Sequence, residues 1–516
     1  MDKQIKRQLE KIMDETTGAY ADVIVQFKST RSKALKELLS AAVETELNRS
    51  MAVSAATILP PPRRAFSGEK SARKILRTQS ASLAANIALS SVGAIADILR
   101  GEVGEAMARN FLGSTIVSDA IDKVRKYKTQ KNRAAPLSMP NIDGARIMVH
   151  RGELPDIMAE AGETLEGVYE NTVIKPPRVS KADGSAELLG GGYQGTTWGL
   201  ERTSTLSAWA TFGTRGQRAD GSKVRVAVLD TGIDATHPDL VGKVADFAEF
   251  DFSGNVTAQG VANARDSGEH GTHVAGTIVG GNASGGWIGV APDAEVIAGL
   301  VLNGGAGGTL AQVIAGIDWA VNSNADIINM SLGGLTFDSS VDTPYQRAIV
   351  DALFRGALVV AAIGNDGHQT TGAPGNDYFS LAVGAHDIQG RCAGFSGGRT
   401  HVLTQSNVIN DDFLPLVYTK PDVSAPGVAV KSCVPNNGYE NFNGTSMATP
   451  HAAGAAALLY AATDMRGLPN NQRAFTAKDL LLGGVSDLGE SGQDQRFGHG
   501  AINVLRSIDE GIKLGF

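Results

Sequence analysis

The sequence has few cysteines and no long hydrophobic run, and each shortage excludes a class of protein. Its cysteines, Cys392 and Cys433, are 41 positions apart and form no C-x-x-C pair, which argues against a disulfide scaffold or a zinc knuckle. Two buried free thiols are expected instead, as in a reducing compartment. No apolar run reaches the ~18 to 20 residues that a membrane helix needs. We therefore expect no membrane partner.

The beginning of the sequence lacks the apolar centre of a secretory signal peptide. Residues 1–20 instead place Ile5, Leu9, Ile12 and Met13 at helical spacing. As written, the chain is expected to be cytoplasmic. It would be secreted if a signal had been removed or if another export route were used.

Aromatic residues make up 6% of the 516 residues, and they do not interleave with the basic ones. Residues 1–190 contain 28 basic and 23 acidic residues, while residues 191–516 contain 19 and 31, so the net charges are +5 and −12. Without aromatic interleaving, the basic half does not indicate a nucleic-acid partner. Complementarity between the halves of one chain is the simpler account. The length favours two or more folding units.

The front half has a β-rich pattern with a helical interruption. Strands are expected at residues 21–27, 51–59, 146–150 and 167–175, and helices at residues 31–47 and 154–161. This order is that of a ferredoxin-like α+β domain, made of residues 1–59 and 141–176.

Residues 60–140 are expected to be an insertion in that domain. Three prolines at 60–62 break the chain, and residues 74–100 and 103–127 then have the periodicity of a helical hairpin. Residues 177–198, rich in Gly, Ser and charge, are expected to be an exposed linker.

The region from residue 199 to 516 has the pattern of an α/β domain. Short β-branched runs such as V-R-V-A-V-L-D, A-D-I-I-N-M-S-L and A-L-V-V-A-A-I alternate with helical patterns. Runs that are apolar on both faces indicate a mainly parallel sheet covered on both sides, that is, three layers. Catalytic groups in such folds gather where strands end.

Ser446 precedes the most apolar stretch of the chain. Residues 451–460 are almost wholly Ala, Gly and Leu, which predicts a helix buried in a large core. At the N-terminus of that helix, unpaired N–H groups and the helix dipole suit a nucleophile whose reaction develops an oxyanion. A serine there is also a common N-cap. Both interpretations stand at this point.

Three other polar residues lie beside segments predicted to be buried. Asp230 ends a strand, where a carboxylate needs a partner such as an imidazole, although it also fits a turn. His270 and His273 suggest a metal pair, but the glutamate of H-E-x-x-H is missing, so zinc is not expected. Asn365 follows A-A-I-G and fits either a turn or an oxyanion donor.

Together these residues lie in motifs that resemble the subtilisin-like serine proteases. The motifs are V-A-V-L-D-T-G-I-D-A-T-H-P-D-L at 226–240, H-G-T-H-V-A-G-T at 270–277, G-V-A-P at 289–292, N-M-S-L-G-G at 329–334, A-A-I-G-N at 361–365, K-P-D-V-S-A-P-G at 420–427, N-G-T-S-M-A-T-P-H at 443–451 and G-H-G-A-I-N at 498–503. The resemblance implies a serine endopeptidase in which Asp230, His270 and Ser446 form the triad and Asn365 the oxyanion hole.

The resemblance also implies a substrate cleft and protein or peptide substrates. The residues that would line the cleft are Gly305, Gly307, Ser331, Leu332, Gly333, Gly364 and Gly372. Gly372 would form the floor of the pocket for the residue before the cut and leave room for a large apolar side chain. Asp366 would shift that preference toward basic residues. The chemistry needs no cofactor.

A structural calcium ion is a further expectation from the resemblance. Asp239 matches a calcium ligand of the family, but Ala283 stands where the family usually has an asparagine, and Asn282 is one position away. We take Asp239 and Asn282 as the candidate ligands.

The front half resembles the propeptide of the family, a domain that assists folding and blocks the cleft. The implied partner is therefore the chain's own N-terminal domain, as an intramolecular inhibitor. Self-cleavage in the linker would fit Leu189 or Tyr193 as the residue before the cut. Two alternatives are a scaffold whose cleft stays covered and a non-proteolytic hydrolase, although the G-x-S-x-G elbow of the latter is absent.

Overall fold

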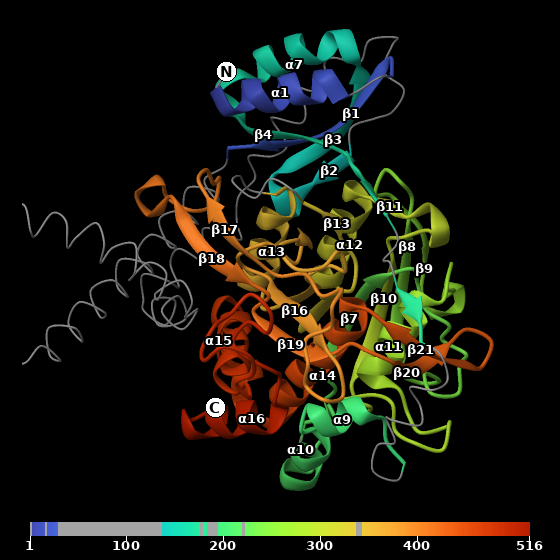
Figure 1. The fold of residues 1–516 in the computed structure, drawn as a ribbon. Helices are drawn as coiled ribbons and strands as arrows, with labels where there is room; N and C mark the ends of the chain where they lie inside the picture. Colours follow the sequence, from blue (N-terminus) through green and yellow to red (C-terminus); the bar gives the residue numbers. More distant parts are fainter. Residues whose placement is uncertain are drawn as a thin grey trace, which may run out of the picture.

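The computed structural model describes residues 3–15, 18–28, 137–175, 179–182, 195–218, 222–336 and 343–516. A small front domain (3–28 and 137–170) lies on a larger main domain (195–516) (Figure 1). The helix expected at 31–47, the strand expected at 51–59 and the expected helical hairpin fall outside the described residues. So do Leu189 and Tyr193.

The main domain is built on an eight-stranded sheet. Its strands, in spatial order, are β19 (Val423–Pro426), β16 (Leu381–His386), β14 (Leu358–Ala362), β12 (Ile327–Met330), β7 (Arg225–Asp230), β10 (Glu295–Leu300), β8 (Val244–Phe250) and β9 (Val256–Gln259). All neighbours are parallel except β8 and β9. The expected mainly parallel sheet is confirmed.

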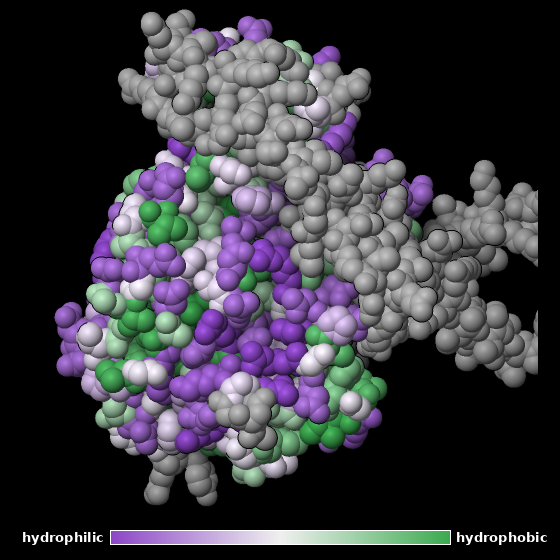
Figure 2. Space-filling model, turned by 180° about the vertical axis from the view of Figure 1, so that it is seen from behind, coloured by the Kyte–Doolittle hydropathy of each residue, from purple (hydrophilic) through white to green (hydrophobic). Residues whose placement is uncertain are grey.

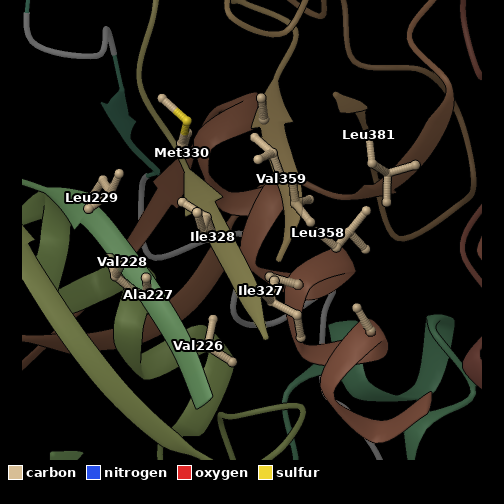
Figure 3. Packing of buried hydrophobic residues seen from close by; sticks show 14 of the residues in the cluster. Val226, Ala227, Val228, Leu229, Ile327, Ile328, Met330, Leu358, Val359 and Leu381 are labelled. Carbon is tan, nitrogen blue, oxygen red and sulfur yellow. The ribbon is translucent and has the colours of Figure 1, made fainter. Parts of the chain in front are cut away.

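The central strands are buried along their whole length. Every residue of β12, β14 and β16 is buried, so both faces of the sheet are covered. Figure 3 shows aliphatic side chains of β7, β12 and β14 packed together near the middle of the sheet. β-Branched residues occur in these runs because they fit a pleated surface that is enclosed on both sides.

Helices enclose the sheet and complete the core (Figure 1). The helices of the main domain are α9 (Trp198–Arg202), α10 (Thr205–Phe212), α11 (His270–Val279), α12 (Leu310–Asn322), α13 (Tyr345–Phe354), α14 (Thr445–Ala462), α15 (Asn470–Gly483) and α16 (Val504–Lys513). Nearly all of α14 is buried, and it packs against five strands of the sheet and against α11. The buried helix expected from the Ala-rich run is therefore present.

The main domain also contains shorter strands outside the eight-stranded sheet. They are β11 (Gly308–Thr309), β13 (Gly334–Leu335), β15 (Gly372–Ala373), β17 (Arg399–Leu403), β18 (Leu416–Lys420), β20 (Val430–Val434) and β21 (Gly438–Asn443). β17 pairs with β18 and β20 pairs with β21 as antiparallel hairpins.

The front domain is a four-stranded antiparallel sheet carrying two helices. Its elements are α1 (Lys3–Glu15), β1 (Tyr20–Phe27), β2 (Leu137–Met139), β3 (Gly144–His150), α7 (Leu154–Ala161) and β4 (Leu165–Glu170), and the strand order is β2-β3-β1-β4. The strands expected at 21–27 and 146–150 and the helix expected at 154–161 are confirmed. Apolar residues of α1 and α7 pack with one face of the sheet, in a core of the front domain's own.

Two boundaries in the front half differ from the expectation. Residues 137–139 lie in the stretch expected to be the insertion, but they form the edge strand β2. The strand expected at 167–175 splits into β4 and β5 (Val173–Ile174). The split follows from contacts with α12, because the Asn171 side chain accepts from the N–H of Ala311 (2.8 Å) and the Thr172 carbonyl accepts from the N–H of Leu310 (3.0 Å). These bonds satisfy N–H groups at the start of α12 that lack partners within the helix.

The second face of the front sheet is completed by the main domain. Ile24, Met139 and Ile142 belong to the hydrophobic cluster of the main domain and not to that of the front domain. Beside them, Arg347 of α13 contacts Asp143 (3.2 Å) and Glu166 (2.6 Å), and its side chain is 5% exposed. The contact between the domains therefore combines apolar packing with a buried group of three charges.

Residues 399–420 form the hairpin of β17 and β18. Its connecting loop contacts the front domain, since the Asn407 side chain donates to the Tyr169 hydroxyl (3.1 Å). The same loop bonds to α13 through Ser406 and Gln346 (3.3 Å). The hairpin thus extends the surface on which the front domain lies.

The described surface is mainly hydrophilic in the view from behind, with hydrophobic residues in small separate groups (Figure 2). Scattered apolar residues of this kind are usual on a protein surface. Among the described helices, none combines the length and the apolar content needed to cross a membrane.

Candidate active site

Four elements converge to place the predicted catalytic residues. Asp230 is the last residue of β7, His270 the first of α11 and Ser446 the second of α14, while Asn365 follows β14. The carboxyl ends of parallel strands meet at one edge of a sheet, which is where such residues can gather.

Asp230 and His270 form a buried hydrogen-bonded pair. The Nδ1 of His270 lies 2.7 Å from Oδ1 of Asp230, and the two side chains are 8% and 1% exposed. The same Oδ1 accepts from the backbone N–H of Thr231 (2.7 Å). With Nδ1–H donated to the carboxylate, Nε2 is left as the acceptor of the ring. Nε2 is buried and has no hydrogen-bond partner within the described residues.

A second carboxylate, that of Asp266, connects the segment after Asp230 with the segment after His270 through hydrogen bonds. Its Oδ1 accepts from the Thr231 hydroxyl (2.7 Å), and its Oδ2 accepts from the N–H and the hydroxyl of Thr272 (2.8 and 2.6 Å). The Thr231 hydroxyl oxygen in turn accepts from the N–H of Gly271 (2.9 Å). This network fixes the start of α11 against the end of β7. Sequence reasoning missed Asp266, since an aspartate in a loop four positions before His270 looks like any turn residue.

Ser446 lies at the beginning of α14 and is 2% exposed. Its hydroxyl donates to the carbonyl of Ser331 (3.1 Å), and the Ser331 hydroxyl donates back to the carbonyl of Ser446 (2.9 Å). The serine hydroxyl is therefore not bonded to His270 in this structure. A rotation about the Cα–Cβ bond would change its partner, and catalytic hydrogen bonds often form only with substrate in place.

Asn365 lies directly beside the start of α14. Its Oδ1 accepts from the backbone N–H and the hydroxyl of Thr445 (2.8 and 2.9 Å). Because Oδ1 of Asn365 accepts both of these bonds, the NH₂ group of the same amide does not face Thr445. A Cβ added at Gly444 would lie 3.4 Å from Nδ2, so the amide packs directly against this residue.

His273 is part of the core and not of a metal site. Its Nε2 lies 3.0 Å from the Val430 carbonyl, and its ring stacks on Phe442 at 4.4 Å. Burial lowers the pKa of His273 to about 3, so the ring is neutral. Within the described residues, no group of three or more His, Cys, Asp or Glu side chains is placed to hold a metal.

The residues expected to line the cleft fall into two sets. Gly305 is exposed and Gly307 buried in the stretch before β11, on one side. On the other side are Ser331, Leu332 and Gly333, with Gly364 and Gly372 nearby. An added Cβ at Gly364 would lie 3.3 Å from the backbone nitrogen of Gly372, and one at Gly333 would lie 2.8 Å from the Ala373 carbonyl. Leu332 is 2% exposed, so its side chain serves packing.

Two segments of the front half, β5 and β6 (Ser180–Lys181), pair with strands near the predicted cleft residues and near Ser446. β5 pairs antiparallel with β11, and an added side chain at Gly307 would collide with the Ile174 carbonyl at 2.1 Å. Beyond it in the chain, β6 pairs antiparallel with β21, next to the turn that leads to Ser446. Gly307 is therefore needed as a glycine for the close approach of a neighbouring strand.

The candidate calcium ligands do not fit a cation. Both carboxylate oxygens of Asp239 accept hydrogen bonds, one from the N–H of Ala283 (2.8 Å) and one from the Tyr439 hydroxyl (2.6 Å). Asn282 is exposed. The Lys243 ammonium also lies in this part of the structure, where it donates to the carbonyls of Val279 (2.6 Å) and Pro292 (2.8 Å). Burial lowers the pKa of Lys243 to about 8. Donors and an ammonium occupy the positions where a cation would need oxygen ligands.

Comparison with known proteins places this arrangement in a family. A model of the subtilase family matches residues 221–500. Subtilisin NAT of Bacillus subtilis subsp. natto is 41% identical over 243 residues, which cover 46% of this chain and 56% of that protein. Subtilisin DY of Bacillus licheniformis is 37% identical over 288 residues, 55% of this chain and 90% of that protein.

Subtilisin Savinase of Lederbergia lenta is 38% identical over 266 residues, which cover 52% of this chain and 84% of that protein. The chain spans only about half the length of some relatives, such as the 56% of subtilisin NAT. The family model covers more than half of the 516 residues. The chain therefore belongs to the subtilase family.

Proposed function

We propose that this chain is a serine endopeptidase, made as a precursor whose front domain inhibits it. The observation that carries the proposal is the buried pair of Asp230 and His270, with Nδ1 bonded to the carboxylate at 2.7 Å and Nε2 left without a partner among the described residues. An imidazole held in this tautomer can accept a proton at Nε2 and so act as a general base.

The proposed reaction assigns one role to each residue. The Oγ of Ser446 attacks the carbonyl carbon of the peptide bond while Nε2 of His270 takes the hydroxyl proton. Asp230 holds the ring and stabilises the imidazolium. The Asn365 amide and the backbone N–H of Ser446 donate to the oxyanion. His270 then gives its proton to the leaving amine, the C–N bond breaks, and water hydrolyses the resulting ester by the same steps.

The front half is proposed to be the propeptide domain, ferredoxin-like, with an insertion that begins at residue 60 and ends before β2 (Leu137–Met139). Support comes from β5 and β6, which pair with strands on two sides of the site in the manner of a bound peptide. Since Lys175 leads away from β5 and Ser180 begins β6, we expect self-cleavage between these residues, on the N-terminal side of Leu189 and Tyr193. The proposed substrates are proteins or peptides.

Intact mass over time tests the proposal, with Ser446→Ala as the matched control. We expect the unmutated chain to lose its first ~175 to 179 residues, a range set by the strand pairing, while the variant stays whole. A new N-terminus near residue 190 would keep the protease and move the cut to Leu189 or Tyr193. A cut in Ser446→Ala as well would contradict self-processing.

A second candidate function is a binding protein with a permanently covered cleft. It is favoured by the same pairing of β5 and β6, which would persist if no cut occurred. A serine-directed fluorophosphonate separates the two functions. Labelling that Ser446→Ala abolishes supports the protease, whereas an unlabelled and uncut chain supports the binding protein.

A further inference from the structure

Two glutamates flank the place where β6 lies. Glu269 directly precedes His270, and Glu440 is in β21. The hairpin of β20 and β21 lies beside α11 in Figure 1. Lys181, which comes from the front half of the chain, sits between them: its Nζ is 3.0 Å from Oε2 of Glu269 and 3.2 Å from Oε1 of Glu440.

Backbone pairing fixes the position of Lys181. Lys181 pairs with Phe442, and Ser180 with Asn443. The N–H of Ala182 donates to the Asn441 carbonyl (2.8 Å), and the Asn443 side chain donates to the Ser180 hydroxyl (3.1 Å). Main-chain bonds of this kind hold an added strand regardless of its sequence, while its side chains meet fixed pockets. Any peptide that follows this path presents one side chain to the two glutamates.

The electrostatics of this position favour a cation. The side chains of Glu269 and Glu440 are 51% and 39% exposed, and within the described residues Lys181 is the ion-pair partner of both. Hydrogen bonds to Glu269 and Glu440 raise the pKa of Lys181 above its ordinary value. The Nζ also lies 5.8 Å from the centre of the Phe442 ring, within the range of a cation–π contact. Without Lys181, the negative charges of Glu269 and Glu440 would lose the cation that lies between them.

If the cut lies between β5 and β6 as proposed, this position holds the part of a substrate after the cut. β6 follows β5 in the chain, and β21 leads within three residues from Asn443 to Ser446. We propose that Glu269 and Glu440 form a subsite there that selects substrates with a Lys or Arg side chain shortly after the cut bond. The inference rests on the proposed endopeptidase function and adds a substrate preference to it.

The test uses the full-length chain and neutral peptides that carry a single lysine at successive positions after the bond that is cut. Matched peptides carry glutamine instead. We expect one position at which lysine raises kcat/KM roughly threefold to thirtyfold over glutamine, from two exposed ion pairs. Glu440→Gln should lower this ratio, and the double variant Glu269→Gln/Glu440→Gln should bring it close to one.

Glu510→Gln is the matched control, because it removes one exposed carboxylate on α16 without touching β6 or β21. It should leave the ratio unchanged. Raising the salt concentration should lower the ratio in the unmutated chain, because exposed charges are screened. Cleavage of all peptides without a lysine preference would overturn the subsite while leaving the endopeptidase intact.

A second measurement decides the case in which no peptide is cut. In full-length Ser446→Ala, hydrogen exchange at the Ala182 amide reports whether β6 stays on β21. Faster exchange in Lys181→Gln and in Glu440→Gln, but not in Glu510→Gln, supports the acidic pair as a site for a basic side chain. Unchanged exchange would overturn it. Fluorophosphonate labelling of the unmutated chain shows independently whether the endopeptidase itself has failed.

Discussion

The two domains are stabilised in different ways. The main domain has a core of its own, in which strands such as β12 and β14 are buried along their whole length. The front domain covers one face of its sheet with α1 and α7, whereas the other face contributes Ile24, Met139 and Ile142 to the core of its neighbour. A buried group of charges around Arg347 lies beside this shared face.

The difference indicates which domain depends on the other. Removing the main domain would expose the apolar residues of the shared face and leave the carboxylates of Asp143 and Glu166 without Arg347. A small sheet with half of its core missing is marginal by itself. We therefore expect the front domain to unfold readily once it is released and the main domain to persist. Each of the following predictions tests one side of this contrast.

The largest effect should separate chemistry from stability within the main domain. Ser446→Ala or His270→Ala should lower kcat by at least ~10⁴-fold, a magnitude known from subtilisin itself, a member of this family. The fold should stay intact, because neither side chain fills a large volume. Activity on a peptide and urea unfolding measured on the same samples check this. A variant that unfolds would mean that the residue was needed for the fold.

Loss of Arg347 should act on the front domain. Arg347→Ala removes the ion pairs to Asp143 and Glu166 at a position where Arg347 is 5% exposed, which should cost about 3 to 5 kcal/mol. Hydrogen exchange at β1 and β3 should rise while exchange at β12 stays slow. Lys513→Ala, which breaks an exposed pair, is the control. Equal loosening of both domains would contradict the contrast.

Asn365→Ala should do the opposite and lower activity without releasing the front domain. We expect about a 10² to 10³-fold loss in kcat, a figure that also comes from subtilisin. Peptide hydrolysis and exchange at β1 measure the two effects side by side. If activity is retained, the amide is a structural group that holds Thr445 and no oxyanion donor.

Acid should weaken the main domain through buried neutral histidines. Burial lowers the pKa of His386, His401 and His451 to about 4, and that of His273 to about 3. Between these values and the ordinary histidine pKa of ~6.5, the unfolded chain binds more protons than the fold, so stability falls as pH falls. Each group should cost about 2 kcal/mol between pH 6.5 and 5. Asp377, whose pKa burial raises to about 6, acts in the opposite direction.

Urea unfolding of Ser446→Ala at pH 8, 6.5 and 5 tests this dependence without self-digestion. His401→Phe is the informative variant, because His401 stacks on Tyr418 at 5.1 Å and both of its ring nitrogens lack partners within the described residues. The free energy of unfolding of His401→Phe should fall less between pH 6.5 and 5 than that of the parent, by the contribution of one histidine. A midpoint that does not change between pH 8 and 5 would show that these rings are not neutral in the fold.

The sequence predicted best where one physical pattern dominates. Runs such as residues 225–230 and 358–362 are apolar on both faces, which only a covered parallel sheet explains, and α14 follows from a stretch with no polar face. The positions of Asp230, His270, Ser446 and Asn365 at element ends follow from the same pattern. Their chemical roles came from the motifs and not from periodicity.

What the sequence did not predict depends on contacts between distant segments. The short strands β2, β5 and β6 have no periodicity to detect, because each is defined by the neighbour it pairs with. The hydrogen bonds of Asp266 span the loop to Thr231, and those of Asp239 reach Tyr439 some 200 positions away. The contacts of Asp239, a candidate calcium ligand, were missed for the same reason, since no local signal shows that Tyr439 and Ala283 engage both of its oxygens.

The pairing of β6 with β21 has a kinetic consequence. The proposed cut between residues 175 and 180 would separate the front domain but leave β6 covalently joined to the main domain through residues 183–194. It would then act as a tethered competitor, present at an effective concentration on the order of millimolar whatever the enzyme concentration. The apparent KM should therefore be raised by a factor that dilution of the enzyme does not change, and substrate in excess should overcome the inhibition.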